Sequence, residues 1–131
     1  MSNQLVVRNS KLAVGEAVAR LRTLLESKNI KIFAHIDHQS AAIDAGLEMA
    51  EEQVLVFGDP RVGTNLMKEQ PQIGIELPLK ILFWNDGGTK VAYREPLTYL
   101  DEFDIVHNRQ IIEKMSTLMA TLVSSVADEQ S

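Results

Sequence analysis

The chain has 131 residues, of which 45% are hydrophobic and 24% charged, and its formal net charge is −5 at pH 7. These proportions predict one globular domain with a single core. An acidic chain without a Lys/Arg cluster lacks the basic surface that phosphate groups require, so we expect no nucleic-acid partner and no membrane partner. The sequence contains no cysteine, which excludes disulfides, thiolate metal sites and cysteine nucleophiles. We also expect no signal peptide and no membrane span, and therefore a cytoplasmic protein.

The N-terminal part of the sequence predicts a strand followed by a long helix. Residues 3–8 are rich in β-branched side chains, which favours a strand. Ser10 is placed to cap a helix that runs to about Ser27. Asn29 follows where a left-handed cap is expected. The helix has one apolar stripe, formed by Val14, Val18, Leu21 and Leu25.

Residues 30–37 predict a second strand that carries an unusual group of polar side chains at its end. Successive residues of a strand point to opposite faces. His35 and Asp37 are therefore expected to share one face, and His38 to continue the other. Residues 39–49 predict a short helix after this strand.

The middle of the chain predicts a third strand, a helix and a further apolar segment. Residues 53–57 favour a strand, and Asp59 followed by Pro60 is a strong helix start. Pro71 ends that helix. The apolar segment that follows is interrupted by Pro78, which we expect at an edge, a bulge or a strand start.

The last part of the chain predicts a hairpin and a long helix. Residues 79–84 are apolar on both faces, so one face is the core and the other is expected to be covered, with a second subunit, identical or different, as one candidate. The turn is predicted at residues 85–88, with a returning strand at 89–95. A final helix is predicted from Asn108 to about Val126, with a stripe formed by Ile112, Met115, Met119, Leu122 and Val126.

The order of these elements predicts an α+β fold, β-α-β-β-β-β-α with short helical insertions. The strands form an antiparallel sheet packed against two long helices. We expect a single domain over residues 1–131, with a core over 4–126 and a flexible tail over 127–131.

Three segments together resemble a known family. They are FAHIDHQSAAIDAGL, VLVFGDPRVGTNLM and PQIGIELPLKILFWNDGGTKVAYREP. Their order and spacing, over roughly residues 11–107, are similar to the domain-of-unknown-function family numbered 302. The resemblance implies a TATA-binding-protein-like topology, in which an antiparallel sheet curves around a long C-terminal helix. It implies no biochemical activity and no catalytic residues.

The sequence HIDH suggests a metal or proton-transfer site. His35, Asp37 and His38, with His107 if the fold brings it near, carry ligand types that suit zinc, iron or nickel. A histidine beside a carboxylate is also a candidate general base. The alternative is structural, with Asp37 or His38 capping the short helix.

A second candidate site is the helix start at Asp59. Free N–H groups at a helix N-terminus attract anions, and Arg61 and Thr64 lie in the first turn. The alternative is that Asp59 itself satisfies those donors. Trp84 is expected to line an apolar pocket between the sheet and a helix.

Three functions are compatible with these features. The leading hypothesis is a cytoplasmic homodimeric domain that binds a small ligand, or acts as an accessory protein, with its site near His38 and Asp59. The first alternative is a metal-dependent enzyme that uses His35, Asp37 or His38. The second is a structural protein-interaction module. The sequence specifies no cofactor and no substrate.

Overall fold

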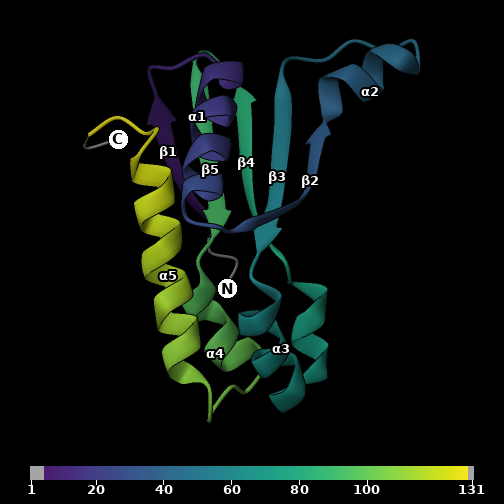
Figure 1. Ribbon diagram of the computed structural model, residues 1–131. Helices are drawn as coiled ribbons and strands as arrows, with labels where there is room; N and C mark the ends of the chain where they lie inside the picture. The colour runs from purple at the N-terminus through teal and green to yellow at the C-terminus, as the bar shows by residue number, and fades with distance from the viewer. Residues whose placement is uncertain (1–4, 130–131) are drawn as a thin grey trace.

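A five-stranded antiparallel sheet forms the centre of the computed structural model, which describes residues 5–129. The strand order is β1-β5-β4-β3-β2, so the first two strands of the chain are the two edges of the sheet (Figure 1). The strands are β1 (Leu5–Ser10), β2 (Lys31–Asp37), β3 (Glu52–Gly58), β4 (Leu79–Asn85) and β5 (Thr89–Arg94). This confirms the predicted antiparallel α+β fold.

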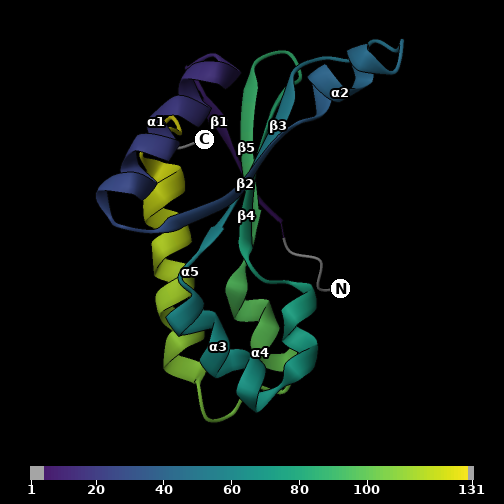
Figure 2. The same ribbon diagram turned by 45° about the vertical axis from the view of Figure 1, so that its right-hand side comes forward.

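The two long helices lie on one side of the sheet. Figure 2 shows the sheet nearly edge-on, with α1 and α5 on one side and α2 projecting to the other. The helices are α1 (Val14–Ser27), α2 (His38–Asp44), α3 (Pro60–Glu69), α4 (Tyr99–Glu102) and α5 (Arg109–Ser124), with 3-10 turns η1 (Pro71–Ile75) and η2 (Pro96–Thr98). Both long helices, α1 and α5, cover the same face of the sheet, so no long helix covers the opposite face. We call that opposite side the open face.

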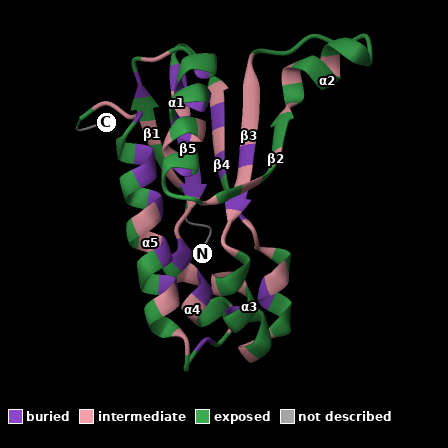
Figure 3. Ribbon diagram, in the orientation of Figure 1, coloured by how far each residue is buried: buried purple, intermediate pink, exposed green. Residues whose placement is uncertain are grey.

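The core lies between the sheet and the helices α1 and α5, where the predicted stripes are buried (Figure 3). Both stripes are confirmed, because every residue predicted for them is buried. They pack against the inward side chains of β3 and β4, which are Leu55, Phe57, Leu79, Ile81 and Phe83. The outward residues of β4, Leu82 and Trp84, are only half-buried, so this strand is apolar on both faces as predicted.

The first helix starts later than predicted. Ser10 is the last residue of β1 and pairs with Thr89, and its buried hydroxyl donates a hydrogen bond to the carbonyl of Val126. The helix begins at Val14, and the carboxylate of Glu16 accepts a hydrogen bond from the N–H of Ala13. Ser10 therefore ties the sheet to the end of α5 instead of capping α1.

The C-terminal end is also tied to β1. The backbone N–H of Asp128 donates to the carbonyl of Asn9, and its carboxylate accepts from the N–H of Lys11. These bonds lie within the predicted flexible tail, so ordered structure continues past residue 126. Residues 1–4, which include the first two positions of the predicted strand over 3–8, and residues 130–131 lie outside the described residues.

A bulge in β2 changes the predicted alternation. The register between β2 and β3 shifts between Ile32 and Ala34. After the shift, His35 lies opposite the buried Leu55, whereas Ala34 lies opposite Val56. His35 therefore shares the helix side of the sheet with Ile32, which strict alternation would place on the other face. Such bulges change the direction of a side chain next to sites and edges.

Candidate functional site

An apolar cavity of about 280 Å³ lies at one end of the sheet, where β2 begins and β3 ends. It is closed by the first turns of α3, by the segment before β4 and by α5. Its lining is Ile30, Phe33, Phe57, Gly58, Asp59, Pro60, Val62, Gly63, Thr64, Met67, Leu77, Pro78, Leu79, Met115 and Leu118. A concave, mainly apolar site with a few polar groups at its edge is the usual form of a small-ligand site.

Local backbone features bring these residues together. The bulge turns Phe33 into the cavity, where the ammonium group of Lys31 lies 4.9 Å from the centroid of its ring. On the opposite wall, Gly58 and Gly63 bring the backbone close to the segment before β4. A Cβ atom at Gly58 would lie 3.6 Å from the Cβ of Pro78, and one at Gly63 would lie 3.6 Å from a methyl carbon of Leu77.

The start of α3 forms the polar edge of this cavity. Asp59 is the N-cap, and its carboxylate accepts from the Arg61 N–H and forms two further hydrogen bonds with the Arg61 guanidinium group, at 3.1 and 3.0 Å. The Arg61 side chain holds the pKa of Asp59 below its ordinary value, mainly through these side-chain hydrogen bonds. The N–H groups of Val62 and Gly63 reach the Asp59 carbonyl.

The geometry at this helix start therefore favours the capping alternative over anion binding. The donors of the first turn are already used within the chain, and the carboxylate adds negative charge. The Thr64 hydroxyl donates to the Pro60 carbonyl at 2.6 Å, which completes the turn. Asp59 and Thr64 line the cavity as polar edge groups, and Arg61 points into solvent.

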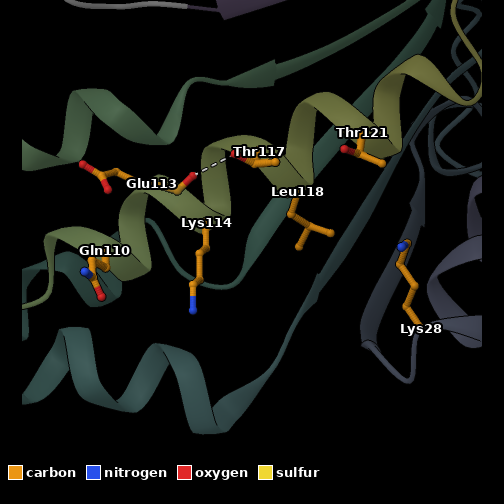
Figure 4. Close-up of a pocket in the computed structure, with 7 residues that line it drawn as sticks. All are labelled: Lys28, Gln110, Glu113, Lys114, Thr117, Leu118 and Thr121. Atoms are coloured by element: carbon orange, nitrogen blue, oxygen red, sulfur yellow. Dashed lines mark hydrogen bonds between the residues drawn. The ribbon is translucent and has the colours of Figure 1, made fainter.

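A second, more open hollow of about 630 Å³ lies beside the cavity along α5 (Figure 4). It is lined by Lys28, Gln110, Glu113, Lys114, Thr117, Leu118 and Thr121. Leu118 lines both spaces, so they adjoin. Figure 4 shows the side chains of Lys114 and Leu118 on the same side of α5, with Lys28 approaching from the turn before β2 and Glu113 extending away from both lysines.

The HIDH segment lies at the opposite end of β2 from the cavity. Asp37 ends β2 and pairs with Gln53, whereas Asp59 follows the other end of β3. Seven residues of strand at about 3.3 Å each separate the two ends by about 20 Å. The fold therefore does not bring His38 and Asp59 into one site.

Two side chains of this segment, those of His35 and Asp37, have structural roles. Asp37 is the N-cap of α2, and its pKa lies below the ordinary value because the N–H of Ser40 donates to it at 2.9 Å. The Nδ1 of His35 accepts from the Arg22 guanidinium at 3.3 Å, and its Nε2 donates to Gln53 at 2.6 Å. These contacts match the capping alternative, and the neighbouring Arg22 cation disfavours a metal ion at His35.

His107 lies far from these residues, in the turn that precedes α5. Its backbone N–H, with those of Val106 and Asn108, donates to the carboxylate of Glu69 at 2.7–3.0 Å. Within residues 5–129, no group of three His, Cys, Asp or Glu side chains could hold a metal ion. The four histidine and aspartate residues proposed as ligands therefore do not form one metal site.

Glu69 was not identified from the sequence, although it joins two helices. It ends α3 and caps the start of α5, and these donated hydrogen bonds lower its pKa to about 2, with the His107 N–H making the largest contribution. The Asn108 side-chain amide adds another bond at 2.8 Å. No local sequence pattern predicts such a cap, because the N–H donor of Asn108 and the Glu69 carboxylate are about 40 positions apart.

Trp84 lies outside the cavity. It is on the open face, beside Glu52 and Lys90 in the register of the sheet. A third hollow, of about 370 Å³, lies on the same face near η1, and Tyr99, Glu76 and Arg94 meet there. The Tyr99 hydroxyl donates to Glu76 at 3.2 Å, and burial raises the pKa of Tyr99.

Comparison with known proteins agrees with this architecture. The chain is similar to the crystal structure of an uncharacterized conserved protein DUF302 from Bacillus stearothermophilus, with a TM-score of 0.82 over 93% of this chain and 97% of that one. The sequence identity is 15%, so this likeness concerns the fold alone.

Curated relatives match over part of their length. Residues of this chain are 36% identical over 87 positions to the protein named fluoride-specific ion channel FluC 1 of Brucella suis biovar 1 (strain 1330), and to FluC 2 of Brucella melitensis biotype 1 (strain ATCC 23456 / CCUG 17765 / NCTC 10094 / 16M). The match covers 66% of this chain but only 34% and 32% of those proteins. Among residues 5–129, no helix combines the length and hydropathy needed to cross a bilayer.

The family assignment rests on nearly the whole chain. The family described as "Domain of unknown function DUF302" matches residues 6–125, which includes the three segments that carry the resemblance. The chain belongs to the DUF302 family.

Proposed function

We propose that this protein is a small-ligand-binding domain whose ligand occupies the apolar cavity between β2, β3, α3 and α5. The cavity carries the proposal: its volume of about 280 Å³ suits a small molecule, and its lining is built from four separate parts of the chain. Burial of an apolar ligand there is favourable at about 25 cal/mol per Å² of apolar surface.

The neighbouring hollow supports a particular class of ligand. Lys28 and Lys114 lie beside the cavity, and Glu113 extends away from them (Figure 4). A molecule with an apolar body in the cavity would place a terminal anion in the hollow that Lys28 and Lys114 line. We therefore propose a small amphipathic anion, such as a medium-chain monocarboxylate.

A pair of ligands that differ in charge tests this proposal. Octanoate and 1-octanol have the same chain length, and displacement of a fluorescent apolar probe measures the affinity of each. We expect octanoate to bind more tightly than 1-octanol in the wild-type protein. The double variant Lys28→Met, Lys114→Met removes both charges and keeps the length of the side chains, so it should remove that preference. Lys68→Met, on the exposed side of α3 and outside both hollows, is the matched control.

Two results would contradict the proposal. Failure of both ligands to displace the probe would exclude the cavity as a site for this class. An octanoate preference that survives in the double variant would exclude the lysines as the anion site.

An accessory module is a second candidate, and one observation favours it. The matched segment makes up about a third of proteins named as fluoride-specific ion channels. A domain found within a longer protein is compatible with a role that supports another activity. Equilibrium binding of the purified chain to such a channel protein, with the cavity empty, is the measurement that separates this function from ligand binding.

The remaining expectations stay predictions. The metal-dependent enzyme has no ligand set among residues 5–129. The cytoplasmic location, expected from the sequence, calls for direct localisation in cells.

A further inference from the structure

The open face carries an apolar row that crosses the entire sheet. The strand registers place Val7 beside Ala92, Ala92 beside Leu82, Leu82 beside Val54, and Val54 beside Ile36. Each of the five strands therefore contributes one member of this row. The outer members are 46% exposed at Val7 and 42% exposed at Ile36. Leu82 and Val54 are partly exposed and Ala92 is only 2% exposed, so the row reaches the surface at four of its five positions. An exposed apolar patch on a protein surface marks an interaction site.

The helix α2 adds to the apolar surface on the same side. Figure 2 shows α2 projecting away from α1 and α5, and Figure 3 shows it exposed. None of its residues is buried. Three large apolar side chains of α2 and the following loop are exposed, namely Ile43, Leu47 and Met49. The apolar row thus continues from the edge strand β2 into this arm.

A charged row lies next to the apolar row and is arranged symmetrically about the middle strand. Trp84 of β4 has Lys90 of β5 on one side and Glu52 of β3 on the other. Because β4 is the third of five strands in the sheet, β5 and β3 are equally far from it. Lys90 donates to Asn9 at 2.7 Å, and its ammonium group keeps two further protons for other acceptors.

We propose that the open face is the interface between two copies of this chain, packed face to face about a two-fold axis that runs along β4. This rotation places β5 over the β3 of the second copy. Lys90 then faces the partner's Glu52, and Glu52 faces the partner's Lys90. The two apolar rows lie over each other, and Trp84 lies near the axis. This inference is independent of the cavity and its ligand.

The charges of the open face favour a two-fold axis along β4 over a two-fold axis across the strands. A two-fold axis across the strands would place β5 over the partner's β5, and would bring the end that carries Lys90 toward the end that carries Arg94. Like charges that face each other oppose association. With the axis along β4, Lys80 lies near the axis and faces the Lys80 of the second copy. Its ammonium group is turned toward the carbonyls of Glu76 and Pro78, at 3.3 and 3.2 Å.

The available area is sufficient for a specific contact. Five strands spaced by about 4.8 Å, each about 20 Å long, give a face of about 500 Å² per copy. Two faces bury about 1,000 Å², which is about the lower limit for a specific interface, before the arm is counted. The proposal therefore predicts a dimer of modest affinity whose formation depends on the charge pairs.

Charge reversal tests the register of this interface. Sedimentation velocity gives the dissociation constant of the wild type, of Lys90→Glu, of Glu52→Lys, and of the protein that carries both changes. Each single reversal creates two like-charge pairs in the dimer, so we expect the dissociation constant to rise at least about ten-fold. The double reversal restores opposite charges and should restore the wild-type value. Thermal unfolding of the single variants checks that each copy still folds.

Trp84 gives a second readout, because it is the only tryptophan of the chain. Its emission should shift to shorter wavelength as the wild-type protein is concentrated, and should not shift in a single-reversal variant. A wild type that stays monomeric at every soluble concentration would overturn the proposal. So would single reversals without effect, or a double reversal that dimerises no better than the single variants.

Discussion

Gly63 lies where the backbone of α3 forms a wall of the cavity, and its replacement separates stability from ligand binding. It is the fourth residue of the helix, so an alanine there removes the helix penalty of glycine, worth about 0.5–1 kcal/mol. The added Cβ would meet Leu77 at 3.6 Å and Met67 at 3.9 Å, which is ordinary van der Waals contact. Gly63→Ala should therefore raise the free energy of unfolding by about 0.5–1 kcal/mol and the Tm by about 2–4 °C.

A larger side chain at the same position should have a different effect. Leucine at position 63 would extend past Leu77 and Met67 into the cavity, and we expect Gly63→Leu to weaken octanoate binding at least about ten-fold while the protein stays folded. Gly15→Ala is the matched control, because it lies in α1 with no atom within 4 Å of the added Cβ. Urea unfolding and probe displacement measure the two effects. A destabilised Gly63→Ala protein, or a Gly63→Leu protein with wild-type octanoate affinity, would refute this reasoning.

Two further predictions concern the helix α3. The pKa of Glu69 is lowered to about 2, so its contribution to stability is complete above about pH 4.5 and is lost as the pH falls toward 2. Glu69→Gln should lose less unfolding free energy than the wild type when the pH falls from 5 to 2. Equal losses in the wild type and the variant would contradict this prediction. Leu66 is fully buried, so Leu66→Ala should cost about 2–5 kcal/mol in urea unfolding. Met67→Ala, at a partly exposed neighbour, should cost clearly less, and similar costs at both positions would contradict the assigned burial.

Local patterns were sufficient to predict most of the elements. The apolar stripes of α1 and α5 follow from helical spacing alone, and all their residues are buried. Asn29 has a φ of 58°, as its position after α1 predicted, and Gly87 and Gly88 in the hairpin turn have φ values of 66° and 133°. Asp59 and Pro60 start a helix as expected. Each of these features depends on residues that are close together in the sequence.

Features that depend on distant pairing were not predictable in this way. Ser10 looks like a helix cap in the sequence, but its pairing with Thr89 extends β1 through it. The bulge beside Phe33 appears only when β2 is aligned with β3. Glu69 finds its donors at the start of α5, which the sequence places far away. These contacts become visible only once the sheet order and the helix packing are known.

The candidate site shows the same division. Asp59 and Thr64 were predicted and line the cavity, but its apolar walls come from residues that the sequence presents as core or surface, such as Phe33 and Met67. His38 and Trp84 were expected nearby, and the strand directions place both elsewhere. A local sequence motif does not define the far walls of a cavity.

Methionine-methyl NMR tests the central claim most directly, because the chain has five methionines and two of them, Met67 and Met115, line the cavity. Met49, on the loop after α2, is the internal control. Titration with octanoate should shift the Met67 and Met115 methyl signals along one saturable curve and leave the Met49 signal unchanged. Unchanged Met67 and Met115 signals at saturating octanoate would show that the cavity does not bind this class of ligand.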